Sequence, residues 1–109
     1  MLITTQDAFA DYQIVRTLGL VKGNTIRARH IGKDILAALR NLVGGEVNEY
    51  TKMLAEAREQ ALDRMVTQAR ILNADGIVCL RFTTATVMQG AAELLAYGTA
   101  VKLQKENPS

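Results

Sequence analysis

Residues 49–72, EYTKMLAEAREQALDRMVTQARIL, carry the strongest structural signal in the chain. Their apolar residues recur every three or four positions, as they do on one face of an α-helix. These positions are Tyr50, Met53, Leu54, Ala57, Ala61, Met65, Ala69 and Leu72. At about 1.5 Å per residue, such a helix would be on the order of 35 Å long. The stretch therefore predicts a long amphipathic helix that packs one face against another part of the protein.

Two adjacent glycines, Gly44 and Gly45, precede this helix and follow a second helical pattern at residues 33–43. A glycine inside a helix costs about 1 kcal/mol relative to Ala, so a break between two helices is favoured here. Gly44 suits the left-handed position just after a helix end, and Asn48 suits the N-cap of the next helix. Alternatively, the glycines allow another backbone or a ligand to approach closely.

Short runs of β-branched and apolar residues predict strands on either side of the helices. The predicted strands cover residues 2–5, 14–28, 77–87 and 93–104. Gly19 and Gly23 indicate either a bulge or a hairpin turning at residues 22–24, so residues 14–28 form one strand or two. The segment NADG at residues 73–76 is expected to end the long helix.

The last predicted strand is apolar on both faces. One face carries Leu95, Tyr97, Val101 and Leu103, and the other carries Leu94, Ala96, Gly98 and Ala100. An antiparallel sheet in a monomer normally leaves one face polar to meet water. Because the helices can cover only one face, we expect a second copy of the chain to cover part of the other.

Length and composition favour a single cytoplasmic domain. A chain of 109 residues makes one domain, which we expect to span residues 1–104 and to precede a disordered tail at residues 105–109. The single Cys excludes an intrachain disulfide and fits a reducing compartment. No secretory signal is visible, and no apolar run approaches the roughly 20 residues of a membrane span. A net charge of +2 does not mark a nucleic-acid binder.

A basic cluster near residues 27–34 is the leading candidate for a ligand site. If residues 26–30 are extended, Arg27 and Arg29 project from the same face, about 7 Å apart. Lys33 lies at the start of the second predicted helix, whose free N–H groups favour an anion. Together with His30, these groups could bind a small carboxylate, a phosphate or a nucleotide.

Two further readings of this cluster bear on its function. Gly44 and Gly45 would lie beside it if the first helix folds back, and their backbone could then approach the ligand. Alternatively, the basic side chains pair with acidic residues of the same or the next subunit, such as Glu46 or Glu49, and bind no ligand.

The residue types give less support to metal binding or catalysis than to anion binding. A soft-metal site needs three or four ligands, whereas this chain offers only His30 and Cys79, with no chelating spacing. A ring of subunits could still gather several copies of one ligand. Cys79 lies within an apolar strand, as a small buried hydrophobe would. The only Ser is Ser109, which excludes a serine-based triad, and no cofactor is expected.

Several segments together resemble one family, the YbjQ-like proteins, which carry the label "putative heavy-metal-binding domain". The matching segments are ITTQD, GLVKGNTIRARHIGKDILAALRNLVGGE, YTKMLAEAREQALDRM, ADGIV and VMQGAAELLAYGTAV, in that order. The resemblance implies an α+β subunit, in which a small antiparallel sheet packs against a long helix, similar in outline to dodecin subunits. It also implies a ring-shaped homo-oligomer, a pentamer, and it implies no established enzymatic activity.

Residues and resemblance together predict a cytoplasmic homo-oligomeric protein with a binding or scaffold role rather than a catalytic one. We expect a small anionic ligand at Arg27, Arg29, His30 and Lys33. The alternative is a metal-binding protein that uses His30 or Cys79 repeated around the ring. The expected partner is the chain itself, and neither nucleic acid nor a membrane is expected to bind.

Overall fold

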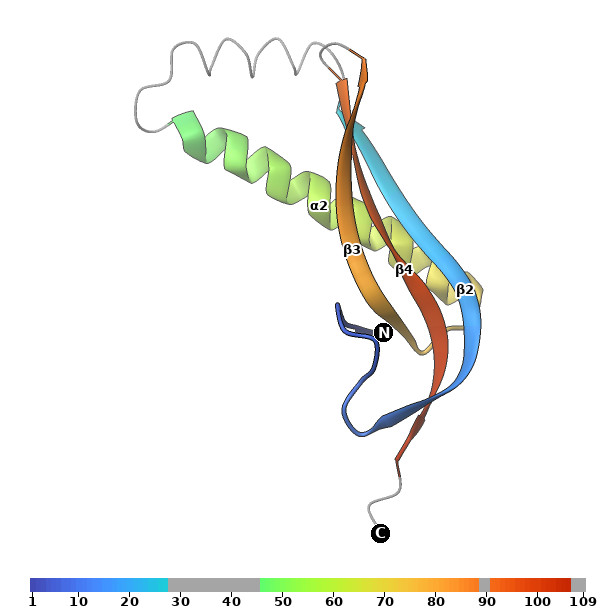
Figure 1. The fold of residues 1–109 in the computed structure, drawn as a ribbon. Coiled ribbons are helices and arrows are strands. Elements are labelled where there is room, and N and C mark those ends of the chain that lie inside the picture. Colours follow the sequence, from blue (N-terminus) through green and yellow to red (C-terminus); the bar gives the residue numbers. More distant parts are fainter. Residues whose placement is uncertain (28–45, 89–90, 107–109) are drawn as a thin grey trace.

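The computed structural model describes residues 1–27, 46–88 and 91–106, which form one mixed sheet and one long helix (Figure 1). The elements are β1 (Leu2–Ile3), β2 (Tyr12–Arg27), α2 (Glu46–Ile71), β3 (Gly76–Met88) and β4 (Ala91–Lys105). β4 extends one residue beyond the boundary predicted for the domain. The predicted helix at residues 33–43 lies outside the described residues.

The sheet has the strand order β1-β3-β4-β2. β4 pairs antiparallel with both β2 and β3, as predicted, but β1 runs parallel to β3. The sheet is therefore mixed, and the prediction of a purely antiparallel sheet is wrong at this edge. A parallel pair requires a crossover connection, and here α2 lies between β1 and β3 in the chain.

β2 is a single long strand, so the hairpin reading of residues 22–24 is wrong. Its register with β4 is continuous from Gly19 to Arg27, with shifts only before Gly19. Gly19 itself has a φ of 129°, a conformation that favours glycine, which confirms the bulge predicted there. Beyond the bulge, buried Val21 and Gly23 alternate with exposed neighbours, the period of a strand covered on one face.

α2 begins at Glu46 rather than at residue 49, so Asn48 lies inside the helix and its prediction as the N-cap is wrong. α2 ends just before the segment NADG at residues 73–76, as predicted. Asn73 has a φ of 60°, and its N–H donates to Arg70 O at 3.0 Å. The N–H of Ala74 donates to Ala69 O at 3.0 Å. These two bonds form a Schellman motif with Asn73 in the left-handed position.

Small residues let α2 lie almost directly on β2 and β4. A Cβ atom at Gly23 would collide with backbone atoms of Ala61 and Met65 in the helix. The facing positions on the helix and on β4 are fully or almost fully buried alanines: Ala57, Ala61, Ala69, Ala96 and Ala100. Close backbone approach thus replaces the interlocking of large side chains, and Gly23 is a contact point rather than a turn.

The buried core is correspondingly small. Among the described residues, the largest fully buried side chains are Met65, Ile77, Val21 and Val101. The centre of the predicted helix stripe is buried as expected, whereas Leu54 and Leu72 near its ends are each 42% exposed. Figure 1 shows the reason at the first end, because the N-terminal part of α2 extends past the sheet. In the part of the chain that the structure describes, no helix could span a membrane.

Replacing Gly23 by Ala tests the close approach of α2 to β2. The added methyl group must displace helix backbone, so we expect the free energy of unfolding to fall by about 1–3 kcal/mol. Chemical denaturation followed by circular dichroism measures the change. Lys22→Ala is the matched control, because it truncates an exposed neighbour and leaves its backbone N–H in place. Equal stability of Gly23→Ala and the wild type would contradict the close packing of α2 on β2.

Candidate functional site

The predicted anion site lies almost entirely outside the described residues. Arg29, His30 and Lys33 belong to residues 28–45, as do both glycines, Gly44 and Gly45. The structure locates only the backbone of Arg27, which is the last residue of β2 and pairs with Ala92 of β4. The predicted cluster therefore begins at the end of the sheet where β2 stops.

A polar hollow of about 230 Å³ lies near this end of the sheet, where sequence patterns alone did not indicate a site. Its lining residues are Lys22 and Asn24 of β2, Glu93 and Leu95 of β4, and Gln68 of α2. The Asn24 amide Nδ2 donates to Glu93 Oε2 at 3.0 Å. Glu93 pairs in register with Ile26, next to Arg27. Glu93 is thus an acidic group close to the predicted cluster, and no sequence motif marks it.

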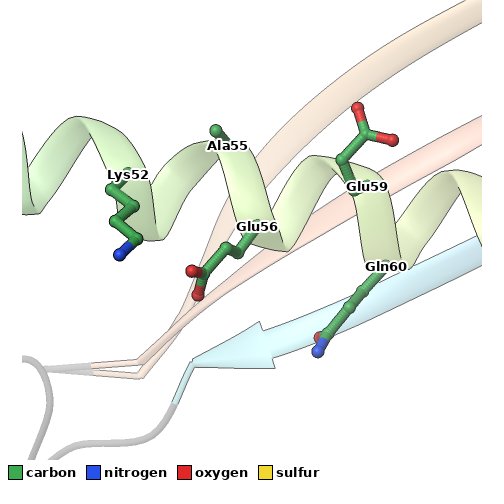
Figure 2. Close-up of a pocket in the computed structure, with 5 residues that line it drawn as sticks. All are labelled: Lys52, Ala55, Glu56, Glu59 and Gln60. Carbon is green, nitrogen blue, oxygen red and sulfur yellow. The ribbon is translucent and has the colours of Figure 1, made fainter.

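A second hollow, of about 470 Å³, lies on α2 (Figure 2). It is lined by Lys52, Ala55, Glu56, Glu59 and Gln60, all from consecutive turns of one helix. Binding sites usually draw converging polar groups from several elements, and this hollow draws on one. We therefore interpret it as the surface of the part of α2 that extends past the sheet.

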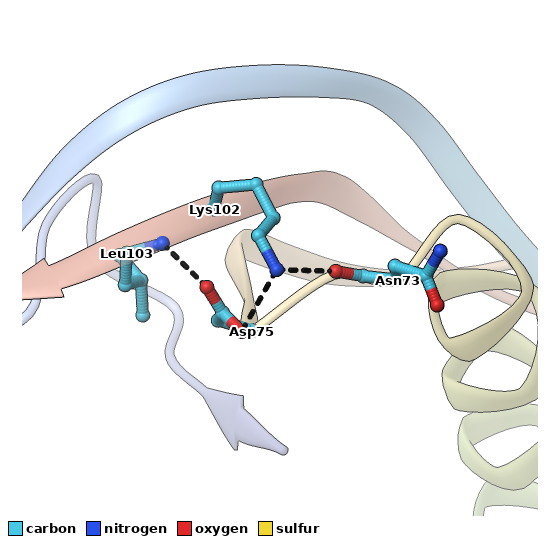
Figure 3. A network of polar contacts seen from close by, with 4 residues as sticks. All are labelled: Asn73, Asp75, Lys102 and Leu103. Carbon is cyan, nitrogen blue, oxygen red and sulfur yellow. Dashed lines mark hydrogen bonds and ion pairs between the residues drawn. The ribbon is translucent and has the colours of Figure 1, made fainter.

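The junction between α2 and β3 is fastened by one carboxylate, Asp75 (Figure 3). Its Oδ2 accepts a hydrogen bond from Leu103 N at 2.9 Å, and its Oδ1 forms an ion pair with Lys102 Nζ at 3.2 Å. Lys102 Nζ also donates to Asn73 O at 2.8 Å. The bond from Leu103, followed by the contact with Lys102, lowers the pKa of Asp75 from its ordinary value of 3.8. These contacts join the helix end to β4 and have a structural role.

Cys79 is not the fully buried strand residue that the sequence predicts. It has a φ of 58° and lies in a β-bulge, where the register with β4 shifts between Val78 and Arg81. Its thiol is free and half-buried, and its N–H donates to Gln6 O at 2.9 Å. Within residues 1–27, 46–88 and 91–106, no three side chains of the His, Cys, Asp and Glu types lie together as a metal site requires.

Large apolar side chains remain exposed on both faces of the sheet. Leu20 and Ile26 of β2 are 66% and 57% exposed, and Phe82 of β3 is 42% exposed. The register places Phe82 beside Ala96 on the face that α2 packs against, whereas Leu20 and Ile26 alternate with buried Val21 and Thr25 and so lie on the other. α2 covers β2 and β4, so neither group is shielded by the helix.

Known proteins are similar in sequence to this chain over nearly its whole length. A family model described as "Putative heavy-metal-binding" matches residues 1–104. A UPF0145 protein of Methanococcus vannielii is 57% identical over 105 residues, which cover 96% of this chain and 100% of that protein. A UPF0145 protein of Dehalococcoides mccartyi is 58% identical and covers 93% of this chain and 97% of that protein.

The fold also occurs among solved structures. The crystal structure of a protein of unknown function from Pediococcus pentosaceus, assigned to the DUF74 family, superposes with a TM-score of 0.63. The alignment covers 95% of this chain and 98% of that one, at 21% sequence identity. At this identity the likeness supports the small α+β fold and nothing further.

The role of Asp75 can be tested by the pH dependence of stability. Because its folded pKa lies below 3.8, the ionised group adds stability above that value, and this stability is lost as the pH falls through the folded pKa. We expect Asp75→Asn to lower the denaturation midpoint at pH 7, and the difference from the wild type to shrink below pH 3.8.

Asp63→Asn, on the exposed surface of α2, is the control for removing a carboxylate elsewhere. It should leave the midpoint at pH 7 unchanged. If the denaturation midpoint of Asp75→Asn stays equally far below that of the wild type at the lowest pH, the carboxylate charge is not what stabilises the junction.

Proposed function

The chain belongs to the YbjQ family, described as "Putative heavy-metal-binding", and from this membership we propose that it is a binding or scaffold subunit that assembles with copies of itself. The observation that carries the proposal is the incomplete cover of the sheet. α2 shields β2 and β4 on one face, while Leu20, Ile26 and Phe82 stay exposed. Exposed apolar surface beside a small core is typical of a subunit interface.

The dimensions of the chain support the same proposal. Its Cα radius of gyration is 17.8 Å, whereas a compact domain of this length has about 13 Å. The extents of 61 × 27 × 17 Å reflect a thin, elongated subunit. Copies that pack on the exposed apolar residues would bury what one chain leaves in water.

A ring of five copies is the assembly that the family resemblance suggests, built from subunits that are similar in outline to dodecin subunits. A ring needs a heterologous contact, in which different surfaces of neighbouring copies meet and the rotation closes. The sheet offers unlike surfaces for such a contact, because its two long edges differ. The edge of β2 lies against α2, and the edge of β3 does not.

The ligand we propose is a small anion held by Arg27, Arg29, His30 and Lys33, with Gly44 and Gly45 leaving room for close backbone approach. What supports this is the position of Arg27 as the last residue of β2. The exposed ends of strands are common places for ligands, because loops there carry side chains on a rigid scaffold. Such a site would lie near a subunit interface and would perform binding rather than catalysis.

The alternative function is metal binding through His30 or Cys79 repeated around the ring, and it takes its support from the family description. The described residues of one chain do not fit a metal, because they contain no group of three ligating side chains. Cys79 is half-buried in a bulge, so its thiol is partly accessible to a partner. A metal site would therefore need ligands from more than one copy.

Anion binding should depend on the two arginines. We expect Arg27→Ala and Arg29→Ala each to weaken the binding of inorganic phosphate, measured by isothermal titration calorimetry on the assembled protein. Wild-type binding should also weaken as salt is raised, since screening reduces attraction between exposed charges. Arg58→Ala, on the exposed surface of α2, is the matched control. If both arginine variants bind phosphate like the wild type, the proposed site is wrong.

Metal binding is tested separately with zinc alone. We expect no zinc to survive desalting of the zinc-treated protein, because the described residues of a chain hold no group of three ligating side chains. Elemental analysis measures the retained metal per chain. Zinc at a fixed ratio in the wild type that is lost in His30→Ala or Cys79→Ala would favour the metal-binding alternative instead.

A further inference from the structure

The outer edge of β3 is paired only along its first residues. β1 pairs with Gly76 and Ile77, and the next backbone contacts end where Leu80 N donates to Thr4 O at 3.1 Å. Beyond Leu80, β3 continues to Met88. In the described parts of the chain, no strand lies on the outer side of this continuation, because β3 is followed in the sheet order only by β1.

The pairing of β2 with β4, and of β4 with β3, determines which backbone groups of β3 point away from the sheet. Lys22 N donates to the Gln68 side chain, so the backbone groups of Lys22 point away from β4. Its register partner Tyr97 must then direct its own groups toward β3, where it pairs with Arg81. Because directions alternate along a strand, Phe82 and Thr84 direct their N–H and C=O groups away from the sheet.

The opposite edge of the sheet is closed by the helix. Gln68 Oε1 accepts the N–H of Lys22 at 2.9 Å. Arg64 Nη1 donates to the carbonyl of Asn24. Two register shifts also interrupt β2 before Gly19. Side-chain cover and bulges of this kind are how proteins keep an edge strand from pairing with other chains.

Among residues 1–27, 46–88 and 91–106, nothing protects the edge of β3 in this way between Arg81 and Ala85. These residues keep a regular register with β4 and include no Pro. The one charged side chain, Arg81, turns back to the N-terminal segment, where its Nη1 donates to Thr5 O at 2.7 Å. Phe82, Thr83 and Thr84 are exposed and have high strand propensity. A native edge of this kind is suited to accept an added strand.

We infer that the β3 edge at Phe82 and Thr84 accepts a strand from a second copy of this chain. The inference rests on the proposed self-assembly and names the surface that it uses. A second copy fits better than a foreign peptide because the exposed apolar side chains are not confined to the β3 edge. Leu20 and Ile26 of β2 are also exposed, on the face that α2 does not cover. A peptide laid along β3 would leave those side chains in water, whereas a copy of the chain can cover them.

Thr84→Pro removes an outward N–H without removing a bond to β4, so it blocks strand addition at this edge. Sedimentation velocity should show the wild type as an assembly and Thr84→Pro as single chains of 11.9 kDa. Circular dichroism should show that the β-signal is retained. Thr84→Val is the matched control, because it keeps both the shape and the N–H, and it should assemble like the wild type.

Hydrogen exchange of the wild-type assembly gives a second readout that needs no variant. We expect the amides of Phe82 and Thr84 to be protected, although the described part of one chain places no strand beside them. Free exchange at both amides in an assembled wild type would overturn the inference, as would a Thr84→Pro variant that still assembles. Either result would leave self-assembly standing. A wild type that sediments as single chains would instead refute the proposed function itself, and the inference with it.

Discussion

The close contact between the backbone of α2 and Gly23 of β2 is the interaction on which the rest of the structure depends. Glycine and alanine at the interface bring the helix so near that it can also bond to the edge of β2, through Gln68 and Arg64. A helix held there covers β2 and β4, but the helix itself covers neither Phe82 of β3 nor the opposite face of the sheet. The exposed Leu20, Ile26 and Phe82 are the direct consequence. One chain therefore has a small core and an incomplete surface.

The exposed apolar side chains connect the fold with the proposed self-assembly, because a second copy could bury them. The asymmetry of the sheet matters most. One long edge is closed by α2, whereas the pairing of the other edge within the described residues ends at Leu80. A subunit with one closed and one open edge has a direction, and repeated directional contacts can close into a ring. The proposed anion site begins at Arg27, the last residue of β2, and would lie near a contact between copies.

The sequence predicted the elements that have a clear period. The buried stripe centred on Ala61 and Met65 identified α2, and runs of β-branched residues identified the long strands. It could not decide the role of Gly23, because a glycine in a strand equally signals a bulge, a turn or a close approach. The parallel pairing of β1 depends on a crossover and has no local signature. The bulge at Cys79 was missed because the residues around it read as a regular apolar strand. The predicted ligand residues beyond Arg27 lie outside the described part of the chain, so they stay predictions.

The central claim is that one chain does not complete its own fold and that copies of it do. Native mass spectrometry of the gently purified wild type tests this most directly, since it counts the subunits and weighs any retained ligand together. We predict a single assembled species whose mass is a whole multiple of 11.9 kDa, five chains for the ring. A bare species at the mass of one chain would contradict the claim.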